Sequence, residues 1–539
     1  MQHWWQDKVL YQIYPRSYKD TNGDGIGDIP GIIEKLDYLE ELGIGGIWLS
    51  PIFKSPQADN GYDVANYEDI EPMFGTLDDL DELIAEADKR GIKIILDLVL
   101  NHTSDEHYWF QEALKGPDNP YYDYYIWRDG EPDVLPNDMG STFSGPAWTY
   151  HEEMGQWYFH QYHKKQPDLN WDNQDMRQDI YAMINRWIDK GVGGFRLDVI
   201  DHLAKDVDQG QLIRYPEIHD IIKELSENCF QGKDVLTVGE AWSATLDESK
   251  LWSNPDGSEL AMVFQFEHIG LDQVEGKEKW DLFPLDFMKL KEVLSRWQVG
   301  LHNKGWNSLF FENHDVPRII SRWGNDGEHR VQSAKMFGTL IHGMQGTPYI
   351  YQGQEIGMTN AHWDDISKYR DVESLNMHAD RLSRGFTEES IMESLMAKSR
   401  DNARTPMQWD ASENAGFTDG EAWIDVNNNY TEINVASQAD DEDSILSHYK
   451  ALVQLRKDYP VIVDGTFELL LTDDEEVFAY RRELDGAELV VVCNFYENEL
   501  ERDLAEIVDG MEVLLASYST VDETNTLRPY ESRIYFKQG

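Results

Sequence analysis

Four acidic residues that are far apart in the sequence each lie at the end of a short apolar segment. They are Asp97, Asp198, Glu240 and Asp315. A single acid at such a position most often caps the helix that follows it. Four such acids at one end of a fold would repel one another, because like charges that are brought close are unfavourable. Their presence together therefore favours a function over helix capping alone. Two carboxyl groups with different pKa values are what transfer of a glycosyl group requires, since one attacks and the other donates a proton.

Neighbouring residues indicate a different role for each acid. Arg196 is two positions before Asp198 on a predicted strand, so the two side chains share a face. The guanidinium predicts a lowered pKa for Asp198, which suits a nucleophile. Trp242 shares a face with Glu240, and an apolar neighbour predicts a raised carboxyl pKa, which suits a proton donor. Asp315 is then left to hold hydroxyl groups of the substrate.

Two histidines accompany these acids. His102 follows the segment that contains Asp97, and His314 directly precedes Asp315. Most single histidines have a structural role, but imidazole nitrogens also bind hydroxyl groups well. Their positions beside the acids therefore favour a role in binding a sugar.

The segments that must position these side chains are short and rich in Ile, Val, Leu or Phe. The apolar residues do not alternate strictly with polar ones, as expected for strands that are covered on both faces. The eight predicted strands are Val9–Pro15, Ile44–Pro51, Ile92–Leu100, Gly193–Ile200, Asp234–Trp242, Met262–Glu267, Ser308–Asp315 and Thr347–Glu355.

Helical patterns lie between the strands. One predicted helix begins at Thr76, with Asp79 completing a capping box, and another covers 173–190 and stops at Gly191. Ser444 caps a third. Eight strand–helix repeats predict an α/β fold of the (β/α)8 TIM-barrel type. An open doubly wound sheet is the alternative, which the missing glycine-rich phosphate motif after the first strand makes weaker.

Two long spacings interrupt the strand–helix pattern. We therefore predict an inserted domain at 103–172, which is rich in Tyr and Trp, and a subdomain insertion at about 356–443. The catalytic barrel then comprises 1–102 and 173–460. Beyond Tyr459-Pro460 only strands are predicted, so 461–539 is expected to form a C-terminal antiparallel β-sandwich domain, with a tight hairpin at Asp485-Gly486.

The composition excludes several classes of protein. Acidic residues number 101 against 47 basic ones, which gives a formal net charge of −54. Such a charge repels phosphate backbones and anionic lipids, so neither nucleic acid nor a membrane is an expected partner. Two cysteines do not form a disulfide framework, and neither a signal peptide nor a transmembrane stretch is visible. We expect a cytoplasmic monomer.

Four sequence strings carry a resemblance to a known family. They are DLVLNH at 97–102, GFRLDV at 194–199, VGEAW at 238–242 and ENHD at 312–315. In this order and at these spacings the chain resembles the α-amylase superfamily of glycoside hydrolases. The resemblance implies the barrel, inserted domain and β domain predicted above. It also implies retention of the α configuration, with Asp198 as nucleophile, Glu240 as acid/base and Asp315 as the third carboxylate.

Three further strings are similar to the oligo-1,6-glucosidase subfamily. They are NGYD at 60–63, QPDLN at 166–170 and RTPMQW at 404–409. The resemblance implies that Asp63 and Arg404 bind the terminal glucose, which closes the pocket and makes cleavage exo, and that Tyr62 stacks on the same sugar. In isolation, Asp63 would be interpreted as a turn residue and Arg404 as a surface residue.

Other residues narrow the resemblance to the glucan 1,6-α-glucosidases (dextran glucosidases) of this subfamily. Val199 is similar to the residue of α-1,6-acting members, whereas α-1,4-acting relatives usually have threonine. Trp242 and Lys279 look like residues that shape the next subsites. The predicted substrate-binding residues are Tyr62, Asp63, His102, Arg196, Val199, Trp242, Lys279, His314 and Arg404. The predicted activity is removal of glucose from isomaltooligosaccharides and short dextrans by hydrolysis of α-1,6 bonds.

Several alternatives stay open at this point. Trehalose-6-phosphate hydrolases and α-1,4-glucosidases share much of the pattern, although a phosphorylated substrate needs a basic pocket. The run Arg318–Trp323 lacks the arginine-dense motif of sucrose isomerases. A non-enzymatic homologue that chaperones a transporter would have lost the catalytic carboxylates and would carry a membrane helix.

An acidic loop after the first strand resembles the start of an EF-hand. Oxygen ligands alternate along it and Gly25 stands at the sixth position, but Gly31 replaces the glutamate expected at the twelfth. The alternative is an Asp/Gly-rich turn. The family resemblance implies a structural calcium ion at this loop, held by Asp20, Asn22, Asp24, the Ile26 carbonyl and Asp28.

Overall fold

A computed structural model describes residues 3–143, 145–521 and 524–539 of the chain. All eight predicted strands are present, and each is shorter than the apolar segment that predicted it. They are β1 (Leu10–Ile13), β2 (Gly46–Leu49), β5 (Lys93–Val99), β9 (Gly194–Asp198), β10 (Leu236–Glu240), β11 (Met262–Phe264), β12 (Ser308–Leu309) and β13 (Thr347–Tyr351).

These strands form one parallel sheet, ordered β11-β10-β9-β5-β2-β1-β13-β12. Apart from β11 and β12 at its two ends, strands that are consecutive among these eight are neighbours in the sheet, and the first strand lies between the second and the last. In a doubly wound sheet, by contrast, the direction in which strands are added reverses after the first few strands. The predicted (β/α)8 barrel is therefore confirmed. Asp198 and Glu240 are the last residues of β9 and β10, the end of a barrel strand at which catalytic groups lie.

The chain divides into two compact units that do not follow the predicted domain boundaries. One comprises Met1–Ile47, Arg90–Ile92 and Phe266–Gly539, and the other comprises Trp48–Lys89 and Lys93–Gln265. We call them the first and second unit and describe each separately. The predicted division into a barrel, an inserted domain and a C-terminal domain stays a prediction.

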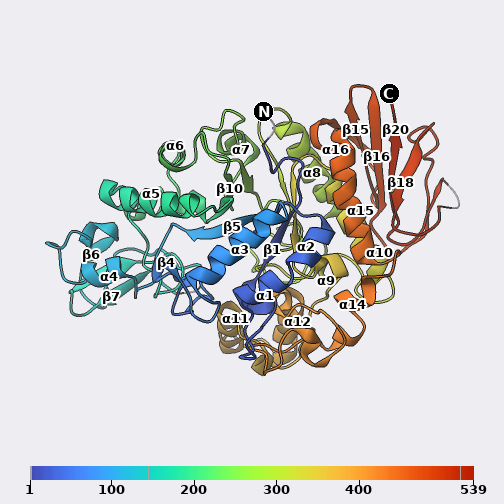
Figure 1. The fold of residues 1–539 in the computed structure, drawn as a ribbon. Helices are drawn as coiled ribbons and strands as arrows, with labels where there is room; N and C mark the ends of the chain where they lie inside the picture. Colours follow the sequence, from blue (N-terminus) through green and yellow to red (C-terminus); the bar gives the residue numbers. More distant parts are fainter. Residues whose placement is uncertain (1–2, 144, 522–523) are drawn as a thin grey trace. The chain divides into compact units, whose positions relative to one another are not determined.

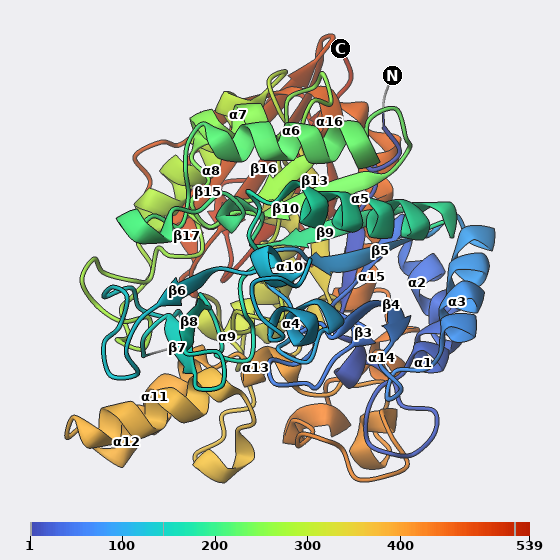
Figure 2. The ribbon, with the colours of Figure 1, turned by 90° about the vertical axis from the view of Figure 1, so that its left-hand side faces the viewer.

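In the second unit, helices follow each of the strands β5, β9 and β10. Figure 2 shows α5 and α6 side by side. Asn173 caps α5 by accepting a hydrogen bond from the Met176 N–H, and Thr76 and Asp79 form the predicted capping box ahead of α3. The helices are α3 (Leu77–Lys89), α4 (Tyr108–Ala113), α5 (Gln174–Asp189), α6 (Glu217–Cys229) and α7 (Leu246–Trp252).

The second unit also contains two small antiparallel sheets. A hairpin pairs β3 (Phe53–Lys54) with β4 (Asn66–Ile70). Within 103–172, a three-stranded sheet pairs β8 (Gln156–Phe159) with β6 (Trp127–Asp129) and β7 (Trp148–His151). Trp148, Trp157 and Phe159 are buried together there, so the aromatic residues of this segment supply a small core of their own.

The first unit contains eleven α-helices in the described part of the chain. Figure 1 shows α11 and α12 as a helical pair. Ser444 caps α15, as predicted, by accepting a hydrogen bond from the Ser447 N–H. The helices are α1 (Ile29–Glu34), α2 (Leu36–Leu42), α8 (Phe287–Leu301), α9 (Ile319–Arg322), α10 (Arg330–His342), α11 (Val372–Ser383), α12 (Glu388–Lys398), α13 (Asp401–Arg404), α14 (Val435–Gln438), α15 (Ile445–Asp458) and α16 (Pro460–Asp464).

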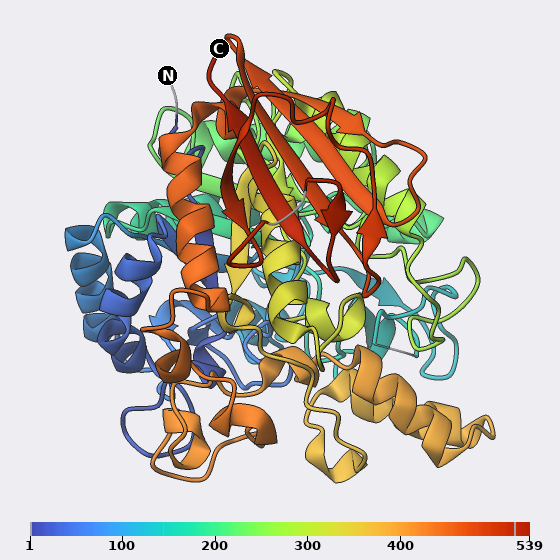
Figure 3. The same ribbon diagram turned by 90° about the vertical axis from the view of Figure 1, so that its right-hand side faces the viewer.

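The C-terminal sheet is antiparallel and lies against α10 and α16 of the same unit (Figure 3). Its order is β14-β15-β16-β20-β18, and β17 pairs with β19 in a separate small sheet. The prediction of strands alone after Pro460 was wrong for α16, a helix that Pro460 begins at a position where proline is well tolerated. The strands are β14 (Thr466–Leu470), β15 (Val477–Leu484), β16 (Ala487–Asn494), β17 (Leu500–Glu501), β18 (Glu512–Ala516), β19 (Thr526–Leu527) and β20 (Ser532–Lys537).

The predicted hairpin joins β15 to β16. Asp485 and Gly486 have φ angles of 51° and 88°, between the paired residues Leu484 and Ala487. Both central residues thus adopt the left-handed conformation of a two-residue hairpin turn. None of the helices in the described residues is long and apolar enough to cross a membrane.

Candidate active site

Three carboxylates of the second unit meet at one buried guanidinium. Nη1 of Arg196 donates to Oδ1 of Asp198 at 2.8 Å and to Oδ1 of Asp97 at 2.9 Å, and Nη2 donates to Oε2 of Glu240 at 2.5 Å. All four side chains are buried, on the adjacent strands β5, β9 and β10. The structure thus brings the predicted nucleophile and the predicted acid/base to a single cation.

Burial affects the pKa values of Asp97 and Asp198 more than the guanidinium of Arg196 does. It raises the pKa of Asp97 to about 6, although Arg196 lowers it. Burial also raises the pKa of Asp198 well above its usual range, and Glu240 and Asp97 add to this while Arg196 opposes it. The predicted lowering at Asp198 was therefore wrong. It considered the nearby positive charge but not the loss of water or the two other acids.

The surroundings of Glu240 are more polar than predicted. The indole N–H of Trp242 donates to Oε1 of Glu240 at 2.8 Å, and the backbone N–H of Val199 donates to Oε2 at 3.2 Å. Trp242 is 52% exposed, so it reaches Glu240 through its polar edge and is not an apolar wall. Val199 has a φ of 35°, which is strained for a β-branched residue and directs its N–H at Glu240.

Asp97 is a residue of this cluster that the predicted catalytic set left out. Its Oδ2 accepts hydrogen bonds from the Tyr62 hydroxyl at 3.0 Å and from the Trp48 indole at 3.1 Å. The guanidinium of Arg196 lies 5.0 Å from the centre of the Trp48 ring. Tyr62 and Trp48 therefore hold Asp97 and Arg196 in place, and the position of Asp97 at a strand end was a signal already visible in the sequence.

His102 is buried near the beginning of the loop that follows β5. Its Nδ1 lies 3.0 Å from the Asn101 side-chain amide, and its Nε2 lies 3.2 Å from the Tyr62 carbonyl oxygen. Burial lowers the pKa of His102 to about 4, so the ring is neutral at physiological pH. Both ring nitrogens thus contact protein groups, and a role of His102 in substrate binding stays a prediction.

Asp63 is fully buried in a loop of the second unit. Its carboxylate accepts hydrogen bonds from the Ser55 hydroxyl at 3.0 Å and from the backbone N–H groups of Ala58 and Asp59 at 2.8 and 2.9 Å. Burial raises the pKa of Asp63, and these three hydrogen bonds oppose the increase. The loop therefore fixes the carboxylate in one orientation.

The predicted third carboxylate belongs to the first unit, where it forms a second cluster. Oδ1 of Asp315 accepts hydrogen bonds from Nη2 of Arg404 at 3.0 Å and from Nη1 of Arg400 at 3.2 Å. Oδ2 lies 3.0 Å from Nε2 of His314. The side-chain amide of Gln12 lies 2.8 Å from Nδ1 of His314, so Nδ1 accepts and Nε2 carries the proton toward Asp315.

Two residues of this second cluster were missed by sequence reasoning. Asp371 binds Nη2 of Arg400 at 2.6 Å and lies 3.5 Å from Nη1 of Arg404. Burial alone would raise the pKa of Asp371, but the two guanidinium groups lower it to about 2. Arg400 is four residues before Arg404, on the same face of a helical turn. That spacing is the signal that could have revealed it.

Lys279 is joined to this cluster through Glu373. Its Nζ lies 2.6 Å from Oε2 of Glu373, which in turn lies 3.5 Å from Nε of Arg400. The chain of contacts therefore runs from Lys279 to Asp315 through one acid and one arginine. The predicted catalytic residues thus lie in two clusters, with Asp198 and Glu240 in the second unit and Asp315 in the first.

The acidic loop of the first unit binds its own backbone. Oδ1 of Asp20 accepts hydrogen bonds from the N–H groups of Asn22 and Gly23, each at 2.9 Å. Asp24 accepts from the Ile26 N–H at 2.9 Å, and Asp28 accepts from the Gly31 N–H at 2.7 Å. In the described part of the chain, no three or more His, Cys, Asp or Glu side chains gather in a group that could hold a metal ion. The oxygen atoms are of the type that calcium prefers.

Comparison with known proteins supplies the family context for these clusters. The family description "Alpha amylase, catalytic domain" matches residues 12–465. An oligo-1,6-glucosidase of Halalkalibacterium halodurans is 51% identical, over 99% of this chain and 98% of the relative. A glucan 1,6-α-glucosidase of Streptococcus pneumoniae is also 51% identical, over 98% of both chains. The crystal structure of a trehalose-6-phosphate hydrolase of Bacillus licheniformis is 48% identical, with a TM-score of 0.94, and the match covers 99% of this chain and all of that one.

Proposed function

Because the chain belongs to the α-amylase family of glycoside hydrolases, we propose that it is a retaining, exo-acting α-glucosidase. It hydrolyses α-1,6 bonds at the non-reducing ends of isomaltooligosaccharides and short dextrans and releases glucose. The observation that carries the proposal is the pair of carboxyl groups of Asp198 and Glu240, which are held on the two amino groups of the Arg196 guanidinium.

The proposed reaction has two steps. Glu240 protonates the glycosidic oxygen while Asp198 attacks the anomeric carbon, so the bond to the leaving sugar breaks and a covalent glucosyl–enzyme forms. Glu240 then takes a proton from a water molecule, which attacks the same carbon and releases Asp198. Two inversions give glucose in the α configuration. Arg196 keeps both groups in place, and Asp315, with Arg404 and His314, holds sugar hydroxyl groups.

The physical cause of the raised pKa of Asp198 is compatible with this two-step scheme. Burial raises the pKa values of Asp198 and Asp97, and the charges of neighbouring acids add to this, so a proton is retained here at a pH where isolated carboxyl groups have lost theirs. A proton donor is therefore present before the reaction. The first step requires this proton to be on Glu240. Hydrogen bonds from Trp242 and Val199 orient the Glu240 carboxyl group.

A panel of substrates tests the linkage. We expect faster hydrolysis of isomaltose, isomaltotriose and panose than of maltose, sucrose or trehalose 6-phosphate, measured as kcat/KM from released glucose. The glucose should appear first as the α anomer in NMR spectra. Preference for maltose would reject the α-1,6 assignment, and early β anomer would reject retention.

Substitution of Asp198 tests the site. We expect Asp198→Asn to reduce kcat by at least about a thousandfold, because the attacking carboxylate is lost. The thermal unfolding midpoint should stay near that of the parent chain. Asp175→Asn, an exposed position at the start of α5, serves as the matched control and should leave kcat unchanged. Substantial activity in Asp198→Asn would exclude Asp198 as the nucleophile.

A second candidate function is hydrolysis of trehalose 6-phosphate. It is supported by the solved relative that carries that name at 48% identity. The net charge of −54 opposes an anionic substrate, since long-range repulsion slows its approach. The same panel decides between the two, because the competing function predicts that trehalose 6-phosphate is the preferred substrate.

For the acidic loop we propose a structural calcium ion bound by Asp20, Asn22, Asp24, the Ile26 carbonyl and Asp28. The oxygen donors at alternate positions support it, and the ion would fix the loop between β1 and α1. Treatment with EGTA should lower the unfolding midpoint, and addition of calcium should restore it. An Asp24→Asn variant should respond less than the parent chain. An unchanged midpoint in EGTA, with magnesium also removed by EDTA, would reject the metal.

A further inference from the structure

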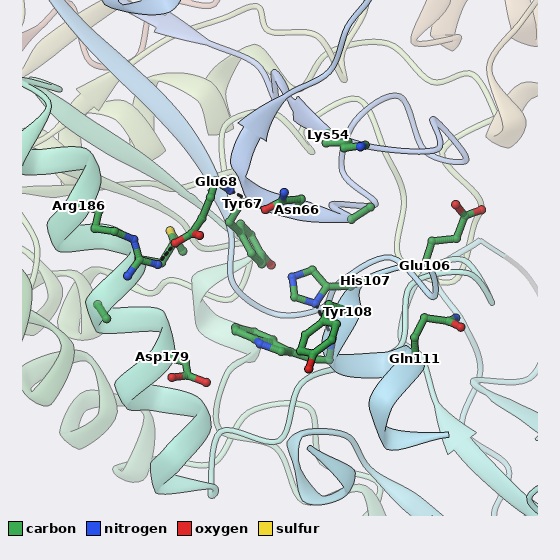
Figure 4. Close-up of a pocket in the computed structure, with 14 residues that line it drawn as sticks. Lys54, Asn66, Tyr67, Glu68, Glu106, His107, Tyr108, Gln111, Asp179 and Arg186 are labelled. Carbon is green, nitrogen blue, oxygen red and sulfur yellow. Dashed lines mark hydrogen bonds and ion pairs between the residues drawn. The ribbon is translucent and has the colours of Figure 1, made fainter. Parts of the chain in front are cut away.

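A surface cavity of about 740 Å³ lies in the second unit, and Asp97, Arg196, Asp198 and Glu240 do not line it. Its walls come from the β3–β4 hairpin, the first turn of α4 and one face of α5 (Figure 4). None of the predicted site residues lines it. The volume is in the range of pockets that hold small ligands, which is about 300–1,000 Å³.

His107 presents a polar atom to this cavity. The residue is only 5% exposed, and its Nδ1 accepts the backbone N–H of Trp109 at 3.1 Å. Since Nδ1 accepts, Nε2 of the neutral ring carries the proton. Nε2 has no hydrogen-bond partner among the described residues. An accessible N–H donor on an otherwise buried ring that lines a cavity is suited to an acceptor atom of a ligand.

Aromatic rings surround this donor. The Trp109 ring centre lies 4.5 Å from that of His107, and the Tyr67 ring centre lies 5.5 Å from it. Tyr108 also lines the cavity and is 59% exposed. The Tyr67 hydroxyl donates to the Val99 carbonyl at 2.6 Å, so the floor of the cavity is anchored to the end of β5. A rigid aromatic floor with an exposed ring at its edge can cover the C–H face of a pyranose.

The charged side chains around the cavity do not select for an ion. Arg186 forms an ion pair with Glu68, so these two charges compensate each other. Asp179 accepts a hydrogen bond from the Tyr124 hydroxyl at 2.8 Å through one oxygen. Asp179 and Glu106 offer acceptors, whereas Lys54 and His107 offer donors. Such a mixture suits hydroxyl groups, which donate and accept at the same time.

We propose that this cavity is a second saccharide-binding site, which holds one or two glucose units of an α-1,6-linked glucan. Tyr108 and Trp109 lie against the faces of the sugar rings. The Nε2–H of His107 donates a hydrogen bond to a ring or hydroxyl oxygen of the sugar. The choice of a glucan rests on the proposed function. The site retains polymeric substrate on the enzyme and takes no part in bond cleavage.

Affinity electrophoresis in native gels with and without dextran tests this site. An Asp198→Asn background prevents hydrolysis during the run. We expect Tyr108→Ala to weaken dextran binding at least about tenfold, through loss of the ring contact. His107→Asn should weaken it about threefold to tenfold, through loss of one hydrogen bond, while the asparagine still caps α4. Phe386→Ala, an aromatic residue that is 37% exposed and does not line the cavity, is the matched control and should bind as the background does.

Kinetics with the intact Asp198 provide a second readout. Tyr108→Ala should keep kcat/KM for isomaltose and lose efficiency on long dextran. Unchanged dextran retention in both cavity variants, or no retention of the parent chain, would overturn the site. Retention that depends on Tyr108 in a chain that hydrolyses no α-glucoside would support the site and reject the proposed function. If the chain hydrolyses isomaltose but its retention by dextran does not depend on Tyr108, the proposed function is supported and the second site is rejected.

Discussion

At the scale of residues, one arginine sets the geometry of the proposed catalytic cluster. Arg196 has donors in a rigid fork, so a single side chain can bind Asp97, Asp198 and Glu240 from three different strands. A lysine at this position would offer one nitrogen atom and could not hold the carboxyl groups of Asp198 and Glu240 on separate donors. The arrangement therefore depends on guanidinium geometry and not only on positive charge.

The raised pKa of Asp97 gives a prediction for stability. Burial raises the pKa from 3.8 to about 6, so the folded protein binds a proton that the unfolded chain has already released. Stability should therefore fall as the pH rises from about 4 to about 6, by at most about 3 kcal/mol from this residue. Urea unfolding at several pH values measures this slope.

The matched variants are Asp97→Asn and Asp440→Asn, the second at an exposed position. Only Asp97→Asn should remove this part of the pH dependence, because an amide does not titrate. A slope that Asp97→Asn leaves intact would mean that other groups cause it.

The residues of the site could be predicted from the sequence better than the pKa values of those residues. Arg196 and Asp198 are two residues apart on one strand, so their shared face followed from strand geometry. The pKa of Asp198 did not follow, because its sign depends on burial and on two acids from other strands. Likewise, Asp371 reaches Arg400 only because a long insertion folds back on itself.

At the scale of elements, local rules determined most of what could be predicted. The eight strands, the capping box at Thr76 and the Asp485-Gly486 turn depend on neighbours within a few residues, and each was found where it was predicted. Strand lengths were overestimated, as for β12, where the apolar run 308–315 contains a strand of only two residues. Apolar composition marks burial, whereas a strand also needs a partner with free backbone groups.

The hairpin between β15 and β16 can be tested directly. Gly486 has a φ of 88°, so Gly486→Ala should destabilise the protein by about 1–2 kcal/mol. Gly270 has open space around it and no positive φ, so Gly270→Ala is the matched control and should change stability by less than about 0.5 kcal/mol. Chemical denaturation measures both, and equal effects would contradict the role of the turn.

At the scale of the whole molecule, negative charge dominates. The chain carries 101 acidic residues and 47 basic residues, and many of the acids lie on the surface. Mutual repulsion among them disfavours the compact state, and dissolved ions screen it. The same charge disfavours binding to nucleic acids and agrees with a neutral substrate.

Salt should therefore stabilise the protein. Raising NaCl from about 10 mM to about 500 mM shortens the screening length from about 30 Å to a few Å. We expect the midpoint of thermal unfolding to rise by about 5 °C or more, with most of the change in the lower part of this range. KCl at equal concentration should have the same effect. A midpoint that stays constant or falls would show that repulsion does not limit stability.

The excess of acid over base around Arg196 has a consequence for inhibition. Three carboxyl groups with one guanidinium keep a net negative charge even when one of them is protonated. A sugar analogue with a protonated ring nitrogen should therefore bind more tightly than an uncharged compound of the same shape. Its advantage should shrink in acid, where the pocket loses the charge that attracts the amine.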